Sequence, residues 1–197
     1  MDTDNKHQRS RRGIYLLPNM ITTAGLFSGF YAIVAAMNGR FEAAAIAIFI
    51  AMVMDGLDGR VARLTNTQSD FGVQYDSLSD MVCFGLAPAL VMYEWALRDM
   101  VSVGWAKLGW LAAFIYAASA ALRLARFNAQ VATAEKSYFR GLPSPSAAGV
   151  LAGLVWAATD LGVRGDDLVY LAFVLTVSMG LLMVSNIRYY SFKEFHF

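Results

Sequence analysis

Long apolar runs alternate with short polar turns along the chain, and this pattern predicts six membrane-spanning helices. The expected spans are residues 18–37, 41–63, 72–97, 105–128, 146–161 and 168–187. An apolar helix of about 20 residues is long enough to cross a hydrocarbon core about 30 Å thick. The pattern therefore predicts an all-α polytopic membrane protein with six transmembrane helices.

The first 17 residues differ from the rest, because polar and basic side chains precede the first apolar run. We expect a cytoplasmic N-terminal segment at residues 1–17 that is either a short helix on the bilayer surface or a disordered tail. The run from Pro18 to Met37 is longer than the apolar region of a secretory signal, and further apolar runs follow it. We therefore interpret it as a retained first span.

Composition supports an integral membrane protein. Of 197 residues, 57% are hydrophobic and 16% are charged, and the mean hydropathy is +0.46, a balance unlike that of soluble globular proteins. No soluble block of domain size is present, so we expect residues 1–197 to form a single membrane domain. The single cysteine, Cys83, excludes an intramolecular disulfide and a cysteine-based metal site.

Basic residues are distributed unevenly between the two sides of the predicted bundle. One side receives Lys6, Arg9, Arg11, Arg12, Arg60, Arg63, Arg123, Arg126, Lys136, Arg140, Arg188 and Lys193, and the other receives Arg40, Arg98, Lys107 and Arg164. Cytoplasmic loops are enriched in lysine and arginine. The pattern thus predicts a protein of the cytoplasmic (inner) membrane with both termini and residues 55–80 facing the cytoplasm.

Four aspartates lie around the turn between the second and third predicted spans. Asp55 and Asp58 are three positions apart and Asp76 and Asp80 are four apart, so the two carboxylates of each pair share one helix face. The short turn between the spans makes the two helices antiparallel neighbours. We therefore expect the four carboxylates to converge.

Such a cluster needs positive charge, because an unpaired aspartate at the centre of a membrane helix costs about 2.5–3.5 kcal/mol. Arg60 and Arg63 could each pair with one aspartate, which is one interpretation. Divalent cations account for the cluster better, and carboxylate ligands select Mg²⁺ or Mn²⁺ over Zn²⁺. Two ions bridged by carboxylates form the clamp used in phosphoryl transfer. Gly56 and Gly59 would let a phosphate approach the helix closely, or would serve helix packing instead.

The spacing of Asp55, Asp58, Gly59, Ala62, Arg63, Gly72, Asp76 and Asp80 resembles the signature of the CDP-alcohol phosphatidyltransferases at every fixed position. Residues 18–22, Pro-Asn-Met-Ile-Thr, are similar to the entry segment of that family. Residues 139–145, Phe-Arg-Gly-Leu-Pro-Ser-Pro, and residues 184–189, Val-Ser-Asn-Ile-Arg-Tyr, resemble its bacterial phosphatidylserine synthase branch.

The resemblance implies a six-helix membrane fold, usually a homodimer, with an active site open to the cytoplasm. By position, Asp55, Asp58, Asp76 and Asp80 would hold two Mg²⁺ or Mn²⁺ ions, and Asp80 would also be the general base. The residues implied to contact CDP-diacylglycerol are Gly59, Arg63, Ser69, Asn19 and Thr22. The branch implies L-serine as the acceptor, phosphatidylserine and CMP as products, and no nucleic-acid partner.

A serine pocket needs a cation for the carboxylate of this small zwitterion. The candidates are Arg123, Arg126 and Arg140, which could bind serine or a lipid phosphate, or could simply obey the cytoplasmic excess of positive charge. Two alternatives to the serine reaction stay open. One is the same chemistry with glycerol 3-phosphate or inositol as acceptor. The other is a divalent-cation transporter, which the apolar outer halves of the spans disfavour.

Overall fold

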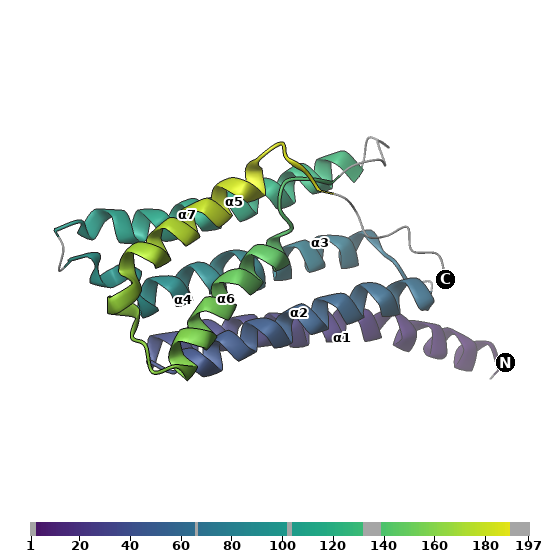
Figure 1. Cartoon of the computed structure of the whole chain (residues 1–197). Coiled ribbons are helices and arrows are strands. Elements are labelled where there is room, and N and C mark those ends of the chain that lie inside the picture. Colours follow the sequence, from purple (N-terminus) through teal and green to yellow (C-terminus); the bar gives the residue numbers. More distant parts are fainter. Residues whose placement is uncertain (1–2, 66, 102–103, 132–138, 190–197) are drawn as a thin grey trace, which may run out of the picture.

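Helices dominate the computed structural model, which describes residues 3–65, 67–101, 104–131 and 139–189. The α-helices are α1 (Thr3–Met37), α2 (Phe41–Leu64), α3 (Asp70–Asp80), α4 (Ala87–Trp95), α5 (Ala106–Val131), α6 (Ser144–Asp160) and α7 (Val169–Val184). The π-helix η1 (Met81–Leu86), the 3₁₀ segments η2 (Leu97–Val101) and η3 (Gly165–Leu168), and the strands β1 (Phe139–Arg140) and β2 (Arg188–Tyr189) complete the described elements. The helices form an elongated bundle (Figure 1). The predicted all-α class is confirmed.

Within the residues that the structure describes, three helical stretches are long and apolar enough to cross a membrane: Leu17–Met37, Lys107–Ala129 and Gly165–Val184. They coincide with the first, fourth and sixth predicted spans, so the prediction of a membrane protein is confirmed. The second, third and fifth predicted spans do not combine the same length and apolar character. The last turns of α2 carry acids and arginines. With 17 residues, α6 rises only about 25 Å. Crossing by these remaining segments stays a prediction.

The N-terminal segment is continuous with the first span. From Thr3 to Met37, α1 is one helix, and Pro18 lies inside it. A separate surface helix or a disordered tail was therefore the wrong expectation for the described part of residues 1–17. A proline inside a helix removes one backbone hydrogen bond and bends or interrupts many helices, but here the helix continues on both sides of it. The early turns of α1 extend beyond the end of α2 (Figure 1).

Small side chains bring α1 and α2 close together. The helices are joined by a tight turn in which Gly39 has a φ of +70°, and buried alanines such as Ala35 and Ala44 line the contact. The Ser28 hydroxyl donates to the carbonyl oxygen of Ala47 at 2.7 Å. Close contact through small residues is the usual way in which membrane helices associate. It places the C-terminal half of α2 beside the turns of α1 around Pro18 and Thr22.

The third predicted span is one helical segment from Asp70 to Trp95 that contains a π-helical stretch. This stretch, η1, begins directly after Asp80. The Tyr116 hydroxyl on α5 donates to the carbonyl oxygen of Phe84 in η1 at 3.1 Å. The Cys83 thiol donates to the carbonyl oxygen of Gly25 on α1 at 3.3 Å. Neighbours on two sides therefore hold the segment immediately beyond Asp80, a feature for which the sequence carried no signal.

A two-stranded ribbon ties the loop before α6 to the end of α7. In β1 and β2, Phe139 pairs with Tyr189 and Arg140 with Arg188 in antiparallel register. The adjoining Gly141 has a φ of +86°, and its N–H donates to the carbonyl oxygen of Ile187 at 3.0 Å. The sequence predicted only a polar loop here, and residues 132–138 of that loop lie outside the described part of the chain.

Candidate active site

Three of the four aspartates converge. Asp55 on α2 and Asp76 and Asp80 on α3 each offer a carboxylate oxygen, and these oxygens lie within 4.8 Å of one another. The spacing within each helix puts the acids on one face, and the short connection between α2 and α3 turns the two faces toward each other. The structure thus agrees with the predicted convergence for these three side chains.

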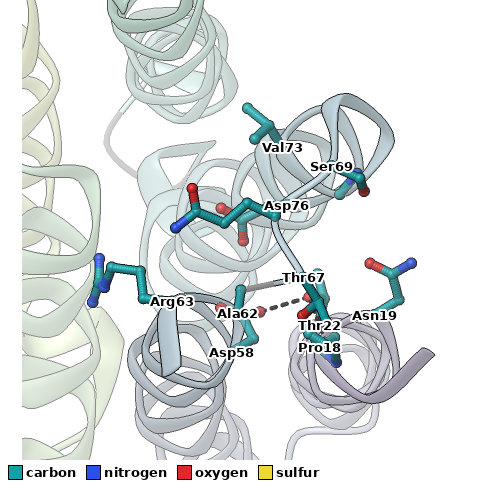
Figure 2. A pocket seen from close by; sticks show the side chains of 13 residues that line it. Pro18, Asn19, Thr22, Asp58, Ala62, Arg63, Thr67, Ser69, Val73 and Asp76 are labelled. Atoms are coloured by element: carbon teal, nitrogen blue, oxygen red, sulfur yellow. Dashed lines mark hydrogen bonds between the residues drawn. The ribbon is translucent and has the colours of Figure 1, made fainter. Parts of the chain in front are cut away.

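Asp58 stands apart from this group. Its side chain is buried on α2, with 5% of its surface exposed, and its Oδ2 accepts a 2.7 Å hydrogen bond from the Thr22 hydroxyl of α1 (Figure 2). The same hydroxyl lies 3.1 Å from the carbonyl oxygen of Pro18. Thr22 therefore orients Asp58, while the other three carboxylates form the tighter cluster.

The arginines near the cluster do not neutralise it. Arg60 and Arg63 are exposed, and the ion pairs among the described residues are Arg98 with Glu94 and Arg164 with Asp166, far along the chain from these acids. The interpretation in which Arg60 and Arg63 pair with the aspartates is therefore wrong. Three converging carboxylates that lack an ion-paired arginine fit a divalent cation, and a ligand set made only of oxygen favours Mg²⁺ or Mn²⁺.

A cavity of about 210 Å³ opens next to the acids, between α1, α2 and the start of α3. All the residues that the resemblance assigned to the CDP-linked lipid line this cavity, as do two of the aspartates: Asn19, Thr22, Gly59, Arg63, Ser69, Asp58 and Asp76. A smaller recess lined by all four aspartates adjoins it, because Thr22, Asp58 and Asp76 line both spaces. Asp58 and Asp76 therefore lie at the wall of the cavity, and Asp55 and Asp80 lie in the recess beside it.

Ser69 has a structural role at the cavity wall. Its hydroxyl accepts a hydrogen bond from the backbone N–H of Gly72 at 3.0 Å, which caps the N-terminus of α3. Serine is among the preferred residues at this position. A side chain at Gly72 would press on Ser69, because an added Cβ would lie 3.2 Å from its Oγ. Ser69 and Gly72 together fix where α3 begins, and hence the positions of Asp76 and Asp80.

The glycines of α2 face open space. A Cβ added at Gly56 or at Gly59 would have no neighbour within 4 Å, so neither glycine is needed for packing within the described residues. Gly59 lines the cavity, where its missing side chain widens the approach to the helix backbone. Arg63, one turn further on, lines the cavity and is exposed, and its side chain extends away from Asp58 and Thr22 (Figure 2).

The end of α5 adds basic and amide side chains beside the acids. The negative charge of Asp80 acts on Arg123, whose Nη1 donates to the Ser144 hydroxyl at the start of α6 at 3.1 Å. Asn128 Nδ2 lies 3.1 Å from the Ser77 hydroxyl of α3. Ser77 and Ser144 were absent from the predicted site residues, because contacts between distant helices leave no local pattern.

The other two predicted acceptor residues are placed differently. Arg126 Nη2 donates to Asn186 Oδ1, beyond α7, at 2.8 Å. Arg140 belongs to β1, but its side chain lies outside the described part of the structure. Of Arg123 and Arg126, whose side chains the structure describes, Arg123 is the one on which the charge of Asp80 acts.

Comparison with known proteins identifies the family of this chain. The family model described as CDP-alcohol phosphatidyltransferase matches residues 15–187. A CDP-diacylglycerol–serine O-phosphatidyltransferase from Helicobacter pylori is 38% identical over 183 residues, which are 92% of this chain and 74% of the relative. Proteins with the same description from Mycobacterium tuberculosis and Bacillus subtilis are 37% and 32% identical over 91% and 90% of this chain, covering 63% and 92% of their own lengths.

The match thus extends from the α1 residues that line the cavity, through the aspartates, to the segment beyond α7. The chain belongs to the CDP-alcohol phosphatidyltransferase family.

Proposed function

We propose that this protein transfers the phosphatidyl group of CDP-diacylglycerol to the hydroxyl of L-serine, giving phosphatidylserine and CMP. The observation that carries the proposal is the convergence of Asp55, Asp76 and Asp80 in a recess that adjoins the cavity. The description shared by relatives from three bacteria supports serine as the acceptor.

The cavity between α1, α2 and α3 is the proposed site for the donor. Gly59 leaves the α2 backbone open to a bulky diphosphate, and Arg63 supplies a guanidinium for its negative charge. Asn19, Thr22 and Ser69 offer polar groups along the opposite wall. Exposed apolar residues such as Met20 and Phe71 lie near this opening in sequence, as suits a substrate whose acyl chains stay in the bilayer.

Asp55, Asp76 and Asp80, together with Asp58, would hold two Mg²⁺ or Mn²⁺ ions. Bound there, the ions would supply charge neutralisation for the phosphate oxygens and for the departing CMP. The hydrogen bond from Thr22 keeps Asp58 turned toward the same space. The carboxylates thus serve first as a rigid ligand set, prepared before the substrates arrive.

Asp80 is the proposed general base. The serine hydroxyl is a poor nucleophile at neutral pH, so a carboxylate must accept its proton as the oxygen attacks the phosphorus that carries diacylglycerol. The bond from that phosphorus to the bridging oxygen breaks, and CMP leaves with the electron pair. Arg123 and Arg126 are the proposed cations of the acceptor side, with Arg140 as the third member predicted from the sequence.

We further propose six membrane crossings within one domain, with the acids and both termini on the cytoplasmic side, and a homodimeric assembly. The excess of basic residues on the side of the acids supports this orientation. The packing of α2, the α3–α4 segment and α6 among the three apolar spans supports a six-helix bundle in the membrane.

The deciding experiment gives labelled CDP-diacylglycerol and Mg²⁺ to the purified protein, with serine, glycerol 3-phosphate or inositol in separate reactions. We expect phosphatidylserine and CMP in equal amounts in the reaction with serine, and no lipid product in the reactions with glycerol 3-phosphate or inositol. Chelation should abolish the reaction, and Mg²⁺ or Mn²⁺ should restore it. A lipid product with another acceptor in place of serine would contradict the proposal. Metal uptake into proteoliposomes without CDP-diacylglycerol would favour the transporter instead.

A further inference from the structure

Arg123 has one side of its guanidinium engaged and one side unpaired. Nη1 donates to the Ser144 hydroxyl, while Nε is buried without a hydrogen-bond partner, the one such side-chain atom in the part of the chain that the structure describes. Buried polar groups almost always have partners, and each exception calls for an explanation. A ligand that accepts a hydrogen bond from Nε would supply one.

The geometry of the guanidinium indicates the kind of ligand. Nε–H and one N–H of Nη2 project from the same edge, and together they match the two oxygens of a carboxylate. Ser144 holds Nη1, on the other edge of the group. The contact with Ser144 therefore uses the edge of Arg123 opposite to Nε, which has no hydrogen-bond partner. Arg126 is a poorer candidate, because Asn186 already accepts a hydrogen bond from its Nη2.

The surroundings of Arg123 favour a small zwitterion over a simple anion. The charge of Asp80 acts on Arg123, and Asp80 lies in a cluster with Asp55 and Asp76. An acidic cluster repels a bare anion, but it attracts the ammonium group of an amino acid. An amino acid whose carboxylate lies on Arg123 would thus turn its ammonium and its hydroxyl toward the acids.

We propose that the Nε and Nη2 edge of Arg123 binds the carboxylate of the acceptor serine, and that Ser144 is a positioning residue that holds Arg123 in this orientation. This inference rests on the proposed function and names its acceptor subsite. It also gives a role to the Gly-Leu-Pro-Ser-Pro turn. That turn is anchored by β1 and β2 and by the hydrogen bond from Gly141 to Ile187. These contacts fix the position of the Ser144 hydroxyl beside Arg123 on α5.

The test compares Arg123→Lys and Ser144→Ala with matched controls. Arg98→Lys changes an exposed arginine paired with Glu94, and Ser146→Ala changes an exposed serine two residues beyond Ser144. The Michaelis constants for serine and for CDP-diacylglycerol are measured separately for each variant. Arg123→Lys should raise the KM for serine by about tenfold or more, the effect of losing one charge-assisted hydrogen bond. Ser144→Ala should raise it by a smaller factor with kcat nearly unchanged.

The KM for CDP-diacylglycerol should stay at the wild-type value in both variants, and the controls should match wild type in both constants. Ser144→Thr keeps the hydroxyl, so its KM for serine should be close to the wild-type value. This variant distinguishes the loss of the hydrogen bond to Arg123 from a general packing defect. An unchanged serine KM in Arg123→Lys would overturn the inference, and so would an equal rise in the KM for the donor. If the wild-type protein makes no phosphatidylserine at all, the proposed function fails rather than the subsite.

Discussion

At the scale of single residues, the four aspartates of the signature differ in their surroundings. Asp55, Asp76 and Asp80 lie within reach of one ion, whereas Asp58 accepts a hydrogen bond from Thr22. Carboxylates at such short distances repel one another strongly where little water screens their charges. This repulsion makes cation binding favourable, and it also makes each acid sensitive to a neutral replacement.

Asp80→Asn tests the role of Asp80 as the proposed general base. Asparagine has nearly the same size but cannot accept the serine proton, so kcat should fall by about 10²- to 10⁴-fold. Single-turnover release of CMP at saturating serine measures this change. Asp70→Asn is the matched control, because Asp70 is exposed in the first turn of α3 and should keep wild-type activity. A kcat within a factor of three of wild type for Asp80→Asn would remove Asp80 as the base.

At the scale of elements, two glycines show how the same residue type serves different purposes. On α1, Gly29 lies against η1, and an added Cβ would fall 2.7 Å from Cys83 Sγ and 2.9 Å from Cys83 Cα. On α2, Gly59 has nothing within 4 Å of the same position. The first glycine permits helix contact, and the second keeps the cavity open.

Alanine at these two positions should therefore change stability in opposite directions. Gly29→Ala should lower the free energy of unfolding by about 1–3 kcal/mol, because the added methyl group overpacks the contact between α1 and η1. Gly59→Ala should raise it by up to about 1 kcal/mol through better helix propensity, while raising the KM for CDP-diacylglycerol. Thermal unfolding in detergent and steady-state kinetics measure the two effects. A stable and fully active Gly29→Ala protein would contradict the packing described here.

At the scale of the whole molecule, the proposed chemistry lies toward one end of the bundle. The turn between α2 and α3 and the early turns of α1 lie at the same end (Figure 1). The turn between α6 and α7, where Arg164 pairs with Asp166, lies at the opposite end. The proposed orientation therefore predicts that residues at the first end are accessible from the cytoplasm and that residues at the opposite end are accessible from the other side of the membrane.

Two leucines with similar exposure provide the test. Leu64, at the end of α2, is 83% exposed, and Leu161, after α6, is 77% exposed. In intact bacterial cells that express the protein, a membrane-impermeant maleimide should label Leu161→Cys. It should label Leu64→Cys only after the cells are permeabilised. Cys83 is buried, so the wild-type chain provides the background control. Labelling of Leu64→Cys in intact cells would reverse the proposed orientation.

Much of the bundle was predictable because apolar length and helix periodicity are local properties. The predicted start of the second span at residue 41 coincides with Phe41 in α2, and the cavity-lining residues assigned by resemblance do share one cavity. The π-helix η1 was not predictable, because it depends on partners such as Tyr116 that lie on another helix. The β1–β2 ribbon was missed for a similar reason, since two-residue strands far apart in the chain carry almost no pattern.

The sequence by itself determined which helix faces carry acids, because spacings of three and four residues recur on one side of an α-helix. Tertiary structure alone decided that Asp58 pairs with Thr22, that Arg60 and Arg63 leave the acids unpaired, and that Arg123 meets Ser144. These outcomes depend on how whole helices pack against one another. Residues far apart in the chain become neighbours only after that packing is complete.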